Sequence, residues 1–161
     1  MSFKIVDNVL PEHIANDIFS VLSSGSFPWF FTPAVVYENN FNNGQYMSHV
    51  IYEDNMIKSK YYEILQPLLE IINPRSLVRA KANLYLVADK VVEHGFHVDY
   101  NWDDIKTAVY YVNSNDGYTK IEDGTKIQSV KNRLATLNPL VSHTSSTCTT
   151  GVRITLNFNW F

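Results

Sequence analysis

The sequence predicts a mainly β protein with N-terminal helices, namely a double-stranded β-helix (jelly roll) with the helices packed on one sheet. Three observations support this prediction. Two stretches in the first 77 residues have apolar side chains at helical spacing, and from residue 78 onward the spacing changes to an alternation of period two. The chain is also rich in aromatic residues, with 10 Tyr, 9 Phe and 3 Trp, which favour strands. Helices followed by many short strands are typical of a layered β fold.

The first helix is expected over residues 10–24, because Pro11 suits a first helical turn and Gly25 is suited to follow a last one. Its apolar face consists of Ile14, Ile18, Val21 and Leu22. A second helix is expected over residues 57–72, with a kink or break at Pro67 because proline cannot donate a backbone hydrogen bond. Its apolar side consists of Tyr61, Ile64, Leu65, Leu68 and Ile72, and Asn73-Pro74 should end it.

Between the helices, the aromatic stretch 26–40 is β-prone, and an Asn-Gly turn signal within 41–45 precedes a strand over 46–52. From residue 78, apolar and polar residues alternate, so one face of each strand is apolar and the other polar. The remaining strands are expected over 78–86, 107–113, 118–121, 125–130, 133–137 and 152–161.

The 161 residues indicate one domain, in which 1–77 form a helical and β support and 78–161 form the core strands with the candidate site. A formal net charge of −3 gives no electrostatic footprint for nucleic acid, and no polybasic run would hold a membrane surface. The single cysteine, Cys148, fits a reducing compartment, and the N-terminus lacks the apolar core of a signal peptide. We therefore expect a cytoplasmic protein without a nucleic-acid or membrane partner, and the sequence does not indicate its oligomeric state.

The candidate catalytic and metal-binding residues are His97 and Asp99, in a His-x-Asp triplet, and the later His143. Two imidazoles and one carboxylate are the ligand set that holds non-haem Fe(II) on one face and leaves the other face open. In an extended segment, residues two apart point to the same side, so His97 and Asp99 can reach one ion. The order of these residues therefore favours a metal-dependent oxygenase.

Arg153 is the principal candidate for binding an acidic co-substrate, because its planar guanidinium suits a carboxylate. It alternates with apolar residues in the last expected strand, so its polar face, shared with Thr155, should line the interior of a jelly roll. By the same alternation, Thr107 and Tyr111 share one face, and Asn83 and Tyr85 share another. These six residues form the predicted co-substrate set.

Three other histidines and the cysteine have alternative interpretations. His94 precedes His97 by three residues, and it could complete a three-histidine zinc site with His97 and His143 in which Asp99 takes no part. We interpret His13 and His49 as structural. Cys148 has no basic neighbour in the sequence to activate its thiol, so we expect it to be inert.

Residues 79–158 resemble the 2-oxoglutarate- and Fe(II)-dependent dioxygenases of the prolyl-4-hydroxylase-like type. The matching segments are RAKANLYL, EHGFHVD, TAVYYVNSNDG, LVSHTSS and GVRITLNF. The resemblance implies that His97, Asp99 and His143 bind iron, that Arg153 and Tyr111 meet the distal carboxylate of 2-oxoglutarate, and that Tyr85 lies near the co-substrate. One departure is the segment Asp116-Gly117-Tyr118-Thr119, where the family usually has two glycines and an acid. It concerns the rim of the substrate site, not the metal ligands.

The resemblance further implies an enzyme that uses Fe(II), 2-oxoglutarate and dioxygen, with ascorbate as a stimulant, to hydroxylate an unactivated C–H bond. The expected substrate is prolyl or otherwise peptidyl, and the alternative is a free amino acid or other small molecule. A non-catalytic metal-binding jelly-roll module is the remaining alternative. Substrate contacts are expected from the loops around 31–45, with FPWFF as a lid candidate, and around 101–106.

Overall fold

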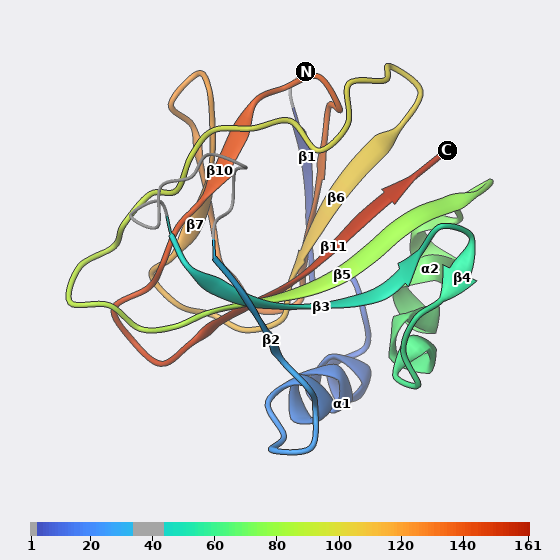
Figure 1. Ribbon diagram of the computed structural model, residues 1–161, viewed down its shortest axis with the longest axis horizontal. Coiled ribbons are helices and arrows are strands. Elements are labelled where there is room, and N and C mark those ends of the chain that lie inside the picture. Colours follow the sequence, from blue (N-terminus) through green and yellow to red (C-terminus); the bar gives the residue numbers. More distant parts are fainter. Residues whose placement is uncertain (1–2, 34–43) are drawn as a thin grey trace.

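The computed structural model describes residues 3–33 and 44–161, and it consists mainly of antiparallel strands with two short α-helices (Figure 1). The strands are β1 (Phe3–Asp7), β2 (Phe30–Thr32), β3 (Tyr46–Glu53), β4 (Met56–Ile57), β5 (Leu77–Tyr85), β6 (Lys106–Tyr111), β7 (Tyr118–Ile121), β8 (Lys126–Gln128), β9 (Arg133–Leu137), β10 (His143–Ser145) and β11 (Arg153–Trp160). The helices are α1 (Glu12–Leu22), the 3-10 helix η1 (Tyr62–Leu65) and α2 (Gln66–Ile72).

Two sheets form the body of the protein. The larger has eight strands in the order β1-β9-β6-β11-β5-β3-β2, with β4 paired to β3, and the smaller has the order β10-β7-β8. The segment before β6 extends the smaller sheet, because Glu93 bridges to Ser146 and His97 bridges to His143. The central pair of the larger sheet, β5 and β11, places Tyr85 opposite Arg153 and Arg79 opposite Asn159.

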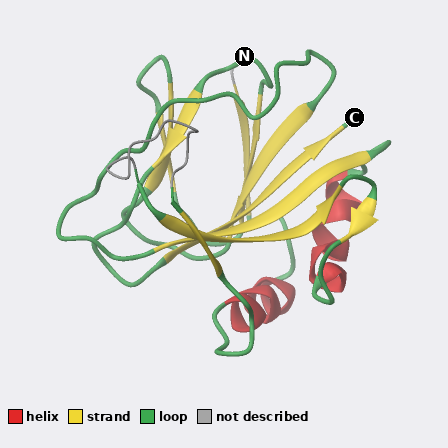
Figure 2. Ribbon diagram, viewed as in Figure 1, coloured by secondary structure: helices red, strands yellow, loops and turns green. Residues whose placement is uncertain are grey.

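Both helices cover the outer face of the larger sheet, as the sequence predicts (Figure 2). The buried core between them includes Leu22 of α1 and Leu68 of α2, packed with Ile154, Leu156 and Phe158 of β11. These even-numbered residues of β11 are its apolar face, so the odd-numbered polar face is directed to the interior between the sheets. The mostly antiparallel architecture is that expected of a jelly roll.

The expectation of one helix over 57–72 is wrong in its first half. Ile57 ends strand β4, and the Lys58 amide donates to the carbonyl of Ile51 in β3 at 2.9 Å, so tertiary pairing overrides the helical spacing. Regular α-helix begins only at Gln66, and Pro67 lies in its first turn, where the missing N–H is not needed. The expected break at Pro67 is therefore confirmed, and Asn73 ends the helix with φ of 47°.

The first helix is shorter than expected at both ends. Pro11 is its N-cap and not part of its first turn, and the helix ends at Leu22, before Gly25. The hydroxyl of Ser23 donates to the carbonyl of Phe19 at 2.7 Å and so satisfies an acceptor of the last turn. Ser23 and Ser24, rather than the glycine, thus provide the polar contacts at this end.

Strands β1, β4 and β10 were not predicted from the sequence. Each is five residues or shorter, and each is held by a partner distant in the chain or by a tight hairpin. The expectations for residues 34–43 lie outside the described residues; they cover part of the 26–40 strand region and most of the 41–45 turn and of the 31–45 loop. FPWFF is described, and its last two residues begin β2. Within the part described, no helix is long and apolar enough to cross a membrane.

We predict that Leu156→Ala lowers the free energy of unfolding by about 2–5 kcal/mol, because this fully buried side chain lies in the core between sheet and helices. Urea denaturation followed by circular dichroism measures the effect. Ile57→Ala, at a side-chain position 59% exposed, is the control and should change stability by less than about 0.5 kcal/mol. Equal losses in the two variants would contradict this assignment of the core.

Candidate metal centre

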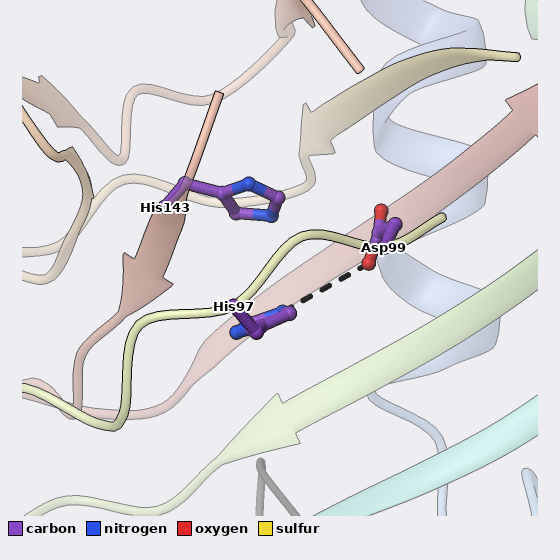
Figure 3. Close-up of side chains that lie close together, drawn as sticks. All are labelled: His97, Asp99 and His143. Atoms are coloured by element: carbon purple, nitrogen blue, oxygen red, sulfur yellow. Dashed lines mark ion pairs between the residues drawn. The ribbon is translucent and has the colours of Figure 1, made fainter. Parts of the chain in front are cut away.

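The side chains of His97, Asp99 and His143 converge at one point between the two sheets (Figure 3). One ligand atom from each residue lies within 4.8 Å of the others. His143 begins β10, and His97 is paired with it through two backbone hydrogen bonds of 2.9 Å, one in each direction. This pairing brings together two histidines that are distant in the sequence.

The imidazole rings are oriented by hydrogen bonds on the side away from the cluster. His97 Nδ1 lies 3.2 Å from the carbonyl oxygen of Gly95, and His143 Nδ1 lies 3.2 Å from that of Val141. A carbonyl only accepts, so each Nδ1 carries the proton and each Nε2 presents a lone pair. Burial lowers the pKa of His97, and the neighbouring His143 lowers it further, which favours the neutral form that a metal requires.

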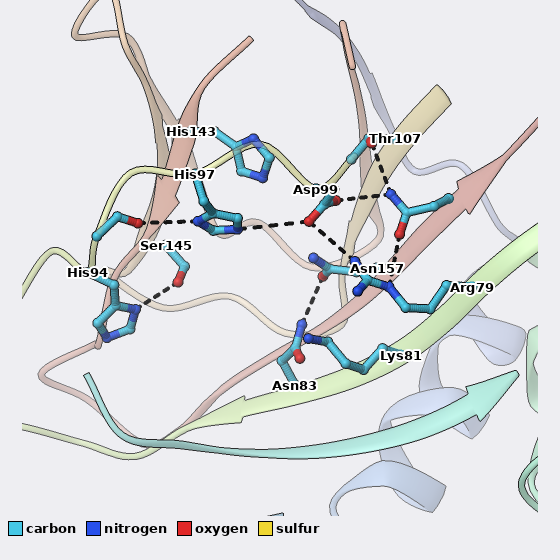
Figure 4. Close-up of polar contacts among 12 residues, drawn as sticks. Arg79, Lys81, Asn83, His94, His97, Asp99, Thr107, His143, Ser145 and Asn157 are labelled. Atoms are coloured by element: carbon cyan, nitrogen blue, oxygen red, sulfur yellow. Dashed lines mark hydrogen bonds and ion pairs between the residues drawn. The ribbon is translucent and has the colours of Figure 1, made fainter. Parts of the chain in front are cut away.

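Asp99 is held by two side chains of the larger sheet (Figure 4). Arg79 Nη2 lies 3.3 Å from Oδ1, and Asn159 Nδ2 donates to Oδ2 at 3.0 Å. Burial raises the pKa of Asp99, but the charges of His143 and Arg79 and the Asn159 hydrogen bond outweigh it, so the net pKa lies below the ordinary value. The carboxylate is therefore ionised, as a metal ligand must be.

Arg153 lies at the other end of the same polar face and is only 1% exposed. It donates to Ser129 Oγ at 2.8 Å, Thr119 Oγ1 at 3.2 Å and the carbonyl of Ser146 at 3.4 Å. None of these acceptors is an acid, and among the described residues Arg153 forms no ion pair. A fully buried guanidinium without a carboxylate is costly unless an anion meets it.

Two of the predicted co-substrate residues contact this guanidinium. The Arg153 Cζ lies 4.9 Å from the ring centroid of Tyr85 and 5.7 Å from that of Tyr111. The Tyr111 hydroxyl donates to Thr119 Oγ1 at 2.8 Å. Burial raises the pKa of both tyrosines, although the Arg153 charge opposes this, so the hydroxyls stay protonated and able to donate.

The other three predicted residues are distributed along the polar face. Asn83 and Thr155 face each other in the β5–β11 register, next to the Tyr85–Arg153 pair. The buried Asn83 Oδ1 has no hydrogen-bond partner among the described residues. Thr107 lies near the candidate metal ligands instead. Its Oγ1 accepts a hydrogen bond from Asn159 Nδ2 at 3.0 Å, so it positions the side chain that binds Asp99 and lies away from Arg153.

The structure places His94 apart from the cluster of ligand atoms, which does not support the three-histidine alternative. Its Nδ1 is 2.7 Å from Ser145 Oγ, and its ring stacks on Tyr85 at 5.3 Å between centroids. His49 is buried with Nδ1 2.6 Å from the carbonyl oxygen of Pro28, consistent with a structural residue. Cys148 is buried, and burial raises the pKa of its thiol, as expected of an unreactive cysteine.

Sequence reasoning missed several residues that support the site. The sequence predicts no role for Asn159 and Arg79, which hold Asp99. Gly117 was noted only as part of a departure from the family pattern. A Cβ on Gly117 would lie 2.6 Å from Arg153 Cδ, so glycine is needed there to admit the arginine side chain. Contacts between residues so distant in the sequence leave no local signal.

No protein-family model and no curated protein sequence matches the chain. Solved structures do match. A prolyl hydroxylase in complex with a hypoxia-inducible-factor oxygen degradation domain peptide fragment, from Trichoplax adhaerens, has 15% identity and a TM-score of 0.73, covering 99% of this chain and 83% of that one. A Pseudomonas putida prolyl-4-hydroxylase has 16% identity and a TM-score of 0.63, covering 99% and 92%.

A third match is HygX from Streptomyces hygroscopicus with nickel and 2-oxoglutarate bound, at 11% identity and a TM-score of 0.66, covering 99% of this chain and 82% of that one. The fold of this chain is therefore that of prolyl hydroxylases and other 2-oxoglutarate- and Fe(II)-dependent oxygenases. At these identities the comparisons establish the fold, and the chemistry has to be argued from the residues of this chain.

We predict that the protein binds one divalent metal ion per chain and that Asn159→Leu weakens this binding roughly 10- to 100-fold, because Asp99 loses its amide partner. His143→Ala should abolish the binding. Calorimetric titration of the metal-free protein with Mn(II) under anaerobic conditions measures both effects. Asn16→Leu, at an exposed position of α1, is the matched control, and equal affinity in both leucine variants would contradict the role of Asn159.

Proposed function

We propose that this protein is a 2-oxoglutarate- and Fe(II)-dependent dioxygenase that hydroxylates an unactivated C–H bond. The principal observation is the pairing of two unsatisfied sites on one polar face. At one end, three metal-ligand side chains converge with their donor atoms aimed at one point. At the other end, a buried arginine lacks an acidic partner among the described residues. A small dicarboxylate that chelates the metal would satisfy both.

The residues present fit Fe(II). Two neutral imidazole nitrogens and one ionised carboxylate on one side are the donor set of non-haem Fe(II) oxygenases, and they leave coordination positions for a co-substrate and dioxygen. Bound there, Fe(II) with 2-oxoglutarate and dioxygen would supply the oxidation of substrate C–H, coupled to release of succinate and CO2. We infer from the same fit that the jelly roll is a double-stranded β-helix of the oxygenase type.

The roles of the protein residues follow from their contacts. His97, Asp99 and His143 hold the metal, while Arg79 and Asn159 fix the Asp99 carboxylate. Arg153 binds the distal carboxylate of 2-oxoglutarate through its planar donors. Its other contacts, Ser129 Oγ and Thr119 Oγ1, keep the guanidinium in place before the anion arrives, so little ordering remains to be done on binding.

Tyr85 and Tyr111 complete the distal end of the proposed co-substrate pocket. Their rings cover the guanidinium and exclude water from it. In our assignment, Tyr111 also directs its hydroxyl to the same carboxylate, and Asn83 and Thr155 line the path between this end and the metal. Exclusion of water strengthens the charge-assisted pair that selects a dicarboxylate.

A prolyl or other peptidyl substrate is the class we propose from the fold. Exposed apolar side chains beside the metal ligands, Phe96 at 45% and Trp102 at 63%, support docking of an extended chain there. A free amino acid or other small molecule is the alternative. The buried arginine argues against a non-catalytic metal-binding module, because such a module has no use for an uncompensated buried charge on the same polar face.

We predict that the protein with Fe(II), ascorbate and 2-oxoglutarate releases succinate, and that Asp99→Ala abolishes this release by removing a metal ligand. A screen of proline-rich peptides and free amino acids, followed by succinate detection, measures the activity. His13→Ala, which removes an exposed histidine of α1, is the control and should retain full turnover. Turnover in Asp99→Ala equal to that of the control would contradict the ligand assignment.

We predict that Arg153→Leu raises the dissociation constant for 2-oxoglutarate roughly 10- to 150-fold, because a charge-assisted pair contributes about 1.5–3 kcal/mol. Anaerobic titration of the Fe(II) protein with 2-oxoglutarate, followed by the metal-to-ligand absorption band, measures this constant. Arg153→Lys keeps the positive charge but lacks the planar set of N–H donors, so its dissociation constant for 2-oxoglutarate should rise by an intermediate amount.

Arg75→Leu, which removes an exposed arginine after α2, is the control for the Arg153 variants. Metal affinity should be unchanged in all of them, because Arg153 does not contact the ligand cluster. A 2-oxoglutarate affinity in Arg153→Leu equal to that of Arg75→Leu would show that the carboxylate is bound elsewhere.

A further inference from the structure

Lys81 is a charged residue of the polar face that the proposed function does not use. It lies on β5 between Arg79 and Asn83 in the alternation, so it faces the interior with them. Its side chain extends along the sheet toward Asn83 and Asn157, on the same side as the metal ligands (Figure 4). Lys81 is opposite Asn157 in the register of β5 and β11.

Lys81 lacks an acidic partner, unlike the arginine beside it. Arg79 forms an ion pair with Asp99, whereas Lys81 forms none among the described residues. Its Nζ donates to the hydroxyl of Tyr46 at 3.2 Å and lies 5.5 Å from the centroid of the Tyr46 ring. Burial lowers the pKa of Lys81, and the charge of Arg79 lowers it further, while more distant acids such as Asp99 and Glu53 oppose this.

The ammonium therefore has the properties of an anion-binding group. It has three N–H donors, and the hydroxyl of Tyr46 uses one of them. A half-buried ammonium that forms no ion pair gains from a carboxylate, because water is partly excluded and the charges are weakly screened. The nearby amides of Asn83 and Asn157 carry no charge and cannot supply this partner.

The register separates Lys81 from the proposed co-substrate pocket. Four residues along a strand span about 13 Å, so Lys81 is attached well away from the Arg153–Tyr85 pair and next to the Arg79–Asn159 pair that holds Asp99. Its ammonium lies beside Tyr46, whose ring stacks on Tyr85 at the edge of the proposed co-substrate pocket.

Exposure separates the same two regions. Arg153, Tyr85 and Asn83 are 5% exposed or less, whereas Lys81 and Asn157 are half-buried. The polar face is therefore more accessible at Lys81 than at Arg153, and we infer that a substrate approaches from the side of Lys81. A group bound by Lys81 would thus belong to the molecule that approaches the metal from outside.

The charges of the site lead to the same conclusion. A divalent metal together with Arg153 balances the two carboxylates of 2-oxoglutarate and the carboxylate of Asp99. Arg79 and Lys81 then remain as excess positive charge next to the metal, and Arg79 is already held by Asp99. We propose that Lys81 binds a carboxylate of the substrate that is oxidised. This favours the alternative substrate class of the proposed function, free amino acids, over an internal residue of a peptide.

This inference rests on the proposed function and is tested on the complete Fe(II) protein with 2-oxoglutarate, under anaerobic conditions. The probes are the free L-amino acids, each paired with its carboxamide, which has the same shape without the negative charge. Binding is followed by the shift of the metal-to-ligand absorption band. The variants are Lys81→Met, which keeps length without charge, Lys81→Arg, which keeps the charge, and Lys106→Met, which removes an exposed lysine of β6.

We expect at least one acid to bind the wild-type protein roughly tenfold or more tightly than its amide, since a charge-assisted contact contributes that much. Lys81→Met should remove this preference, while Lys81→Arg and Lys106→Met retain it. The dissociation constant for 2-oxoglutarate should stay within about twofold in Lys81→Met, and urea denaturation should show that it is folded.

Three outcomes overturn the inference. If no acid binds better than its amide, or if Lys81→Met retains the preference, then Lys81 does not bind a substrate carboxylate. If Lys81→Met weakens 2-oxoglutarate binding as Arg153→Leu is expected to, the lysine serves the co-substrate. The absorption band distinguishes a failure of this inference from a failure of the proposed function, because absence of the band from the wild-type protein would contradict the proposed function.

Discussion

The pairing of β5 with β11 is the constraint on which the rest of the structure depends. These strands lie at the centre of the larger sheet, and their antiparallel register places Tyr85 opposite Arg153 and Arg79 opposite Asn159. Because side chains alternate, one face of the pair packs on the helices while the other supplies both ends of the candidate site. A slip of one residue would exchange the faces, exposing Leu156 to the polar interior and burying Arg153 beneath the helices. The core and the site are thus specified by the same set of backbone hydrogen bonds.

The second sheet contributes what the first lacks. Its strand β10 carries His143, and the segment paired to it carries His97, so two imidazoles face the carboxylate that the larger sheet holds through Arg79 and Asn159. The metal centre is therefore an interface between the sheets, and each sheet provides part of it. The interior charges are separated along the strand direction, with the anionic ligand at one end and the buried arginine at the other.

Much of this arrangement could be predicted from the sequence because it depends on periodicity. The alternation from residue 78 onward indicates the polar and apolar faces of β5 and β11, and the His-x-Asp triplet with a later histidine indicates the three side chains that the fold brings together. What could not be predicted depends on contacts between distant segments. The helical spacing over 57–72 was real, but pairing with β3 keeps residues 57 and 58 extended, and residues 62–65 form only the 3-10 helix η1. Short strands such as β1 and β10 form because a strand from a distant part of the chain offers an edge. Thr107 was assigned to the co-substrate end from its face alone, and only the register of β6 against β11 shows that it lies beside Asp99.

The backbone hydrogen bonds between His97 and His143 have a consequence for the choice of metal. Ligands fixed by a strand pairing, with their Nδ1 atoms already held by carbonyl groups, are in position before any ion arrives. The cost of ordering these side chains is part of the free energy of folding, so metal binding does not have to supply it. Such a preformed set of two nitrogens and one oxygen follows the general order of affinities among divalent ions, in which nickel, copper and zinc bind more tightly than ferrous iron. The ion that the protein holds in a cell is then decided by the supply of free metals and the order in which they are encountered, and not by discrimination within the chain.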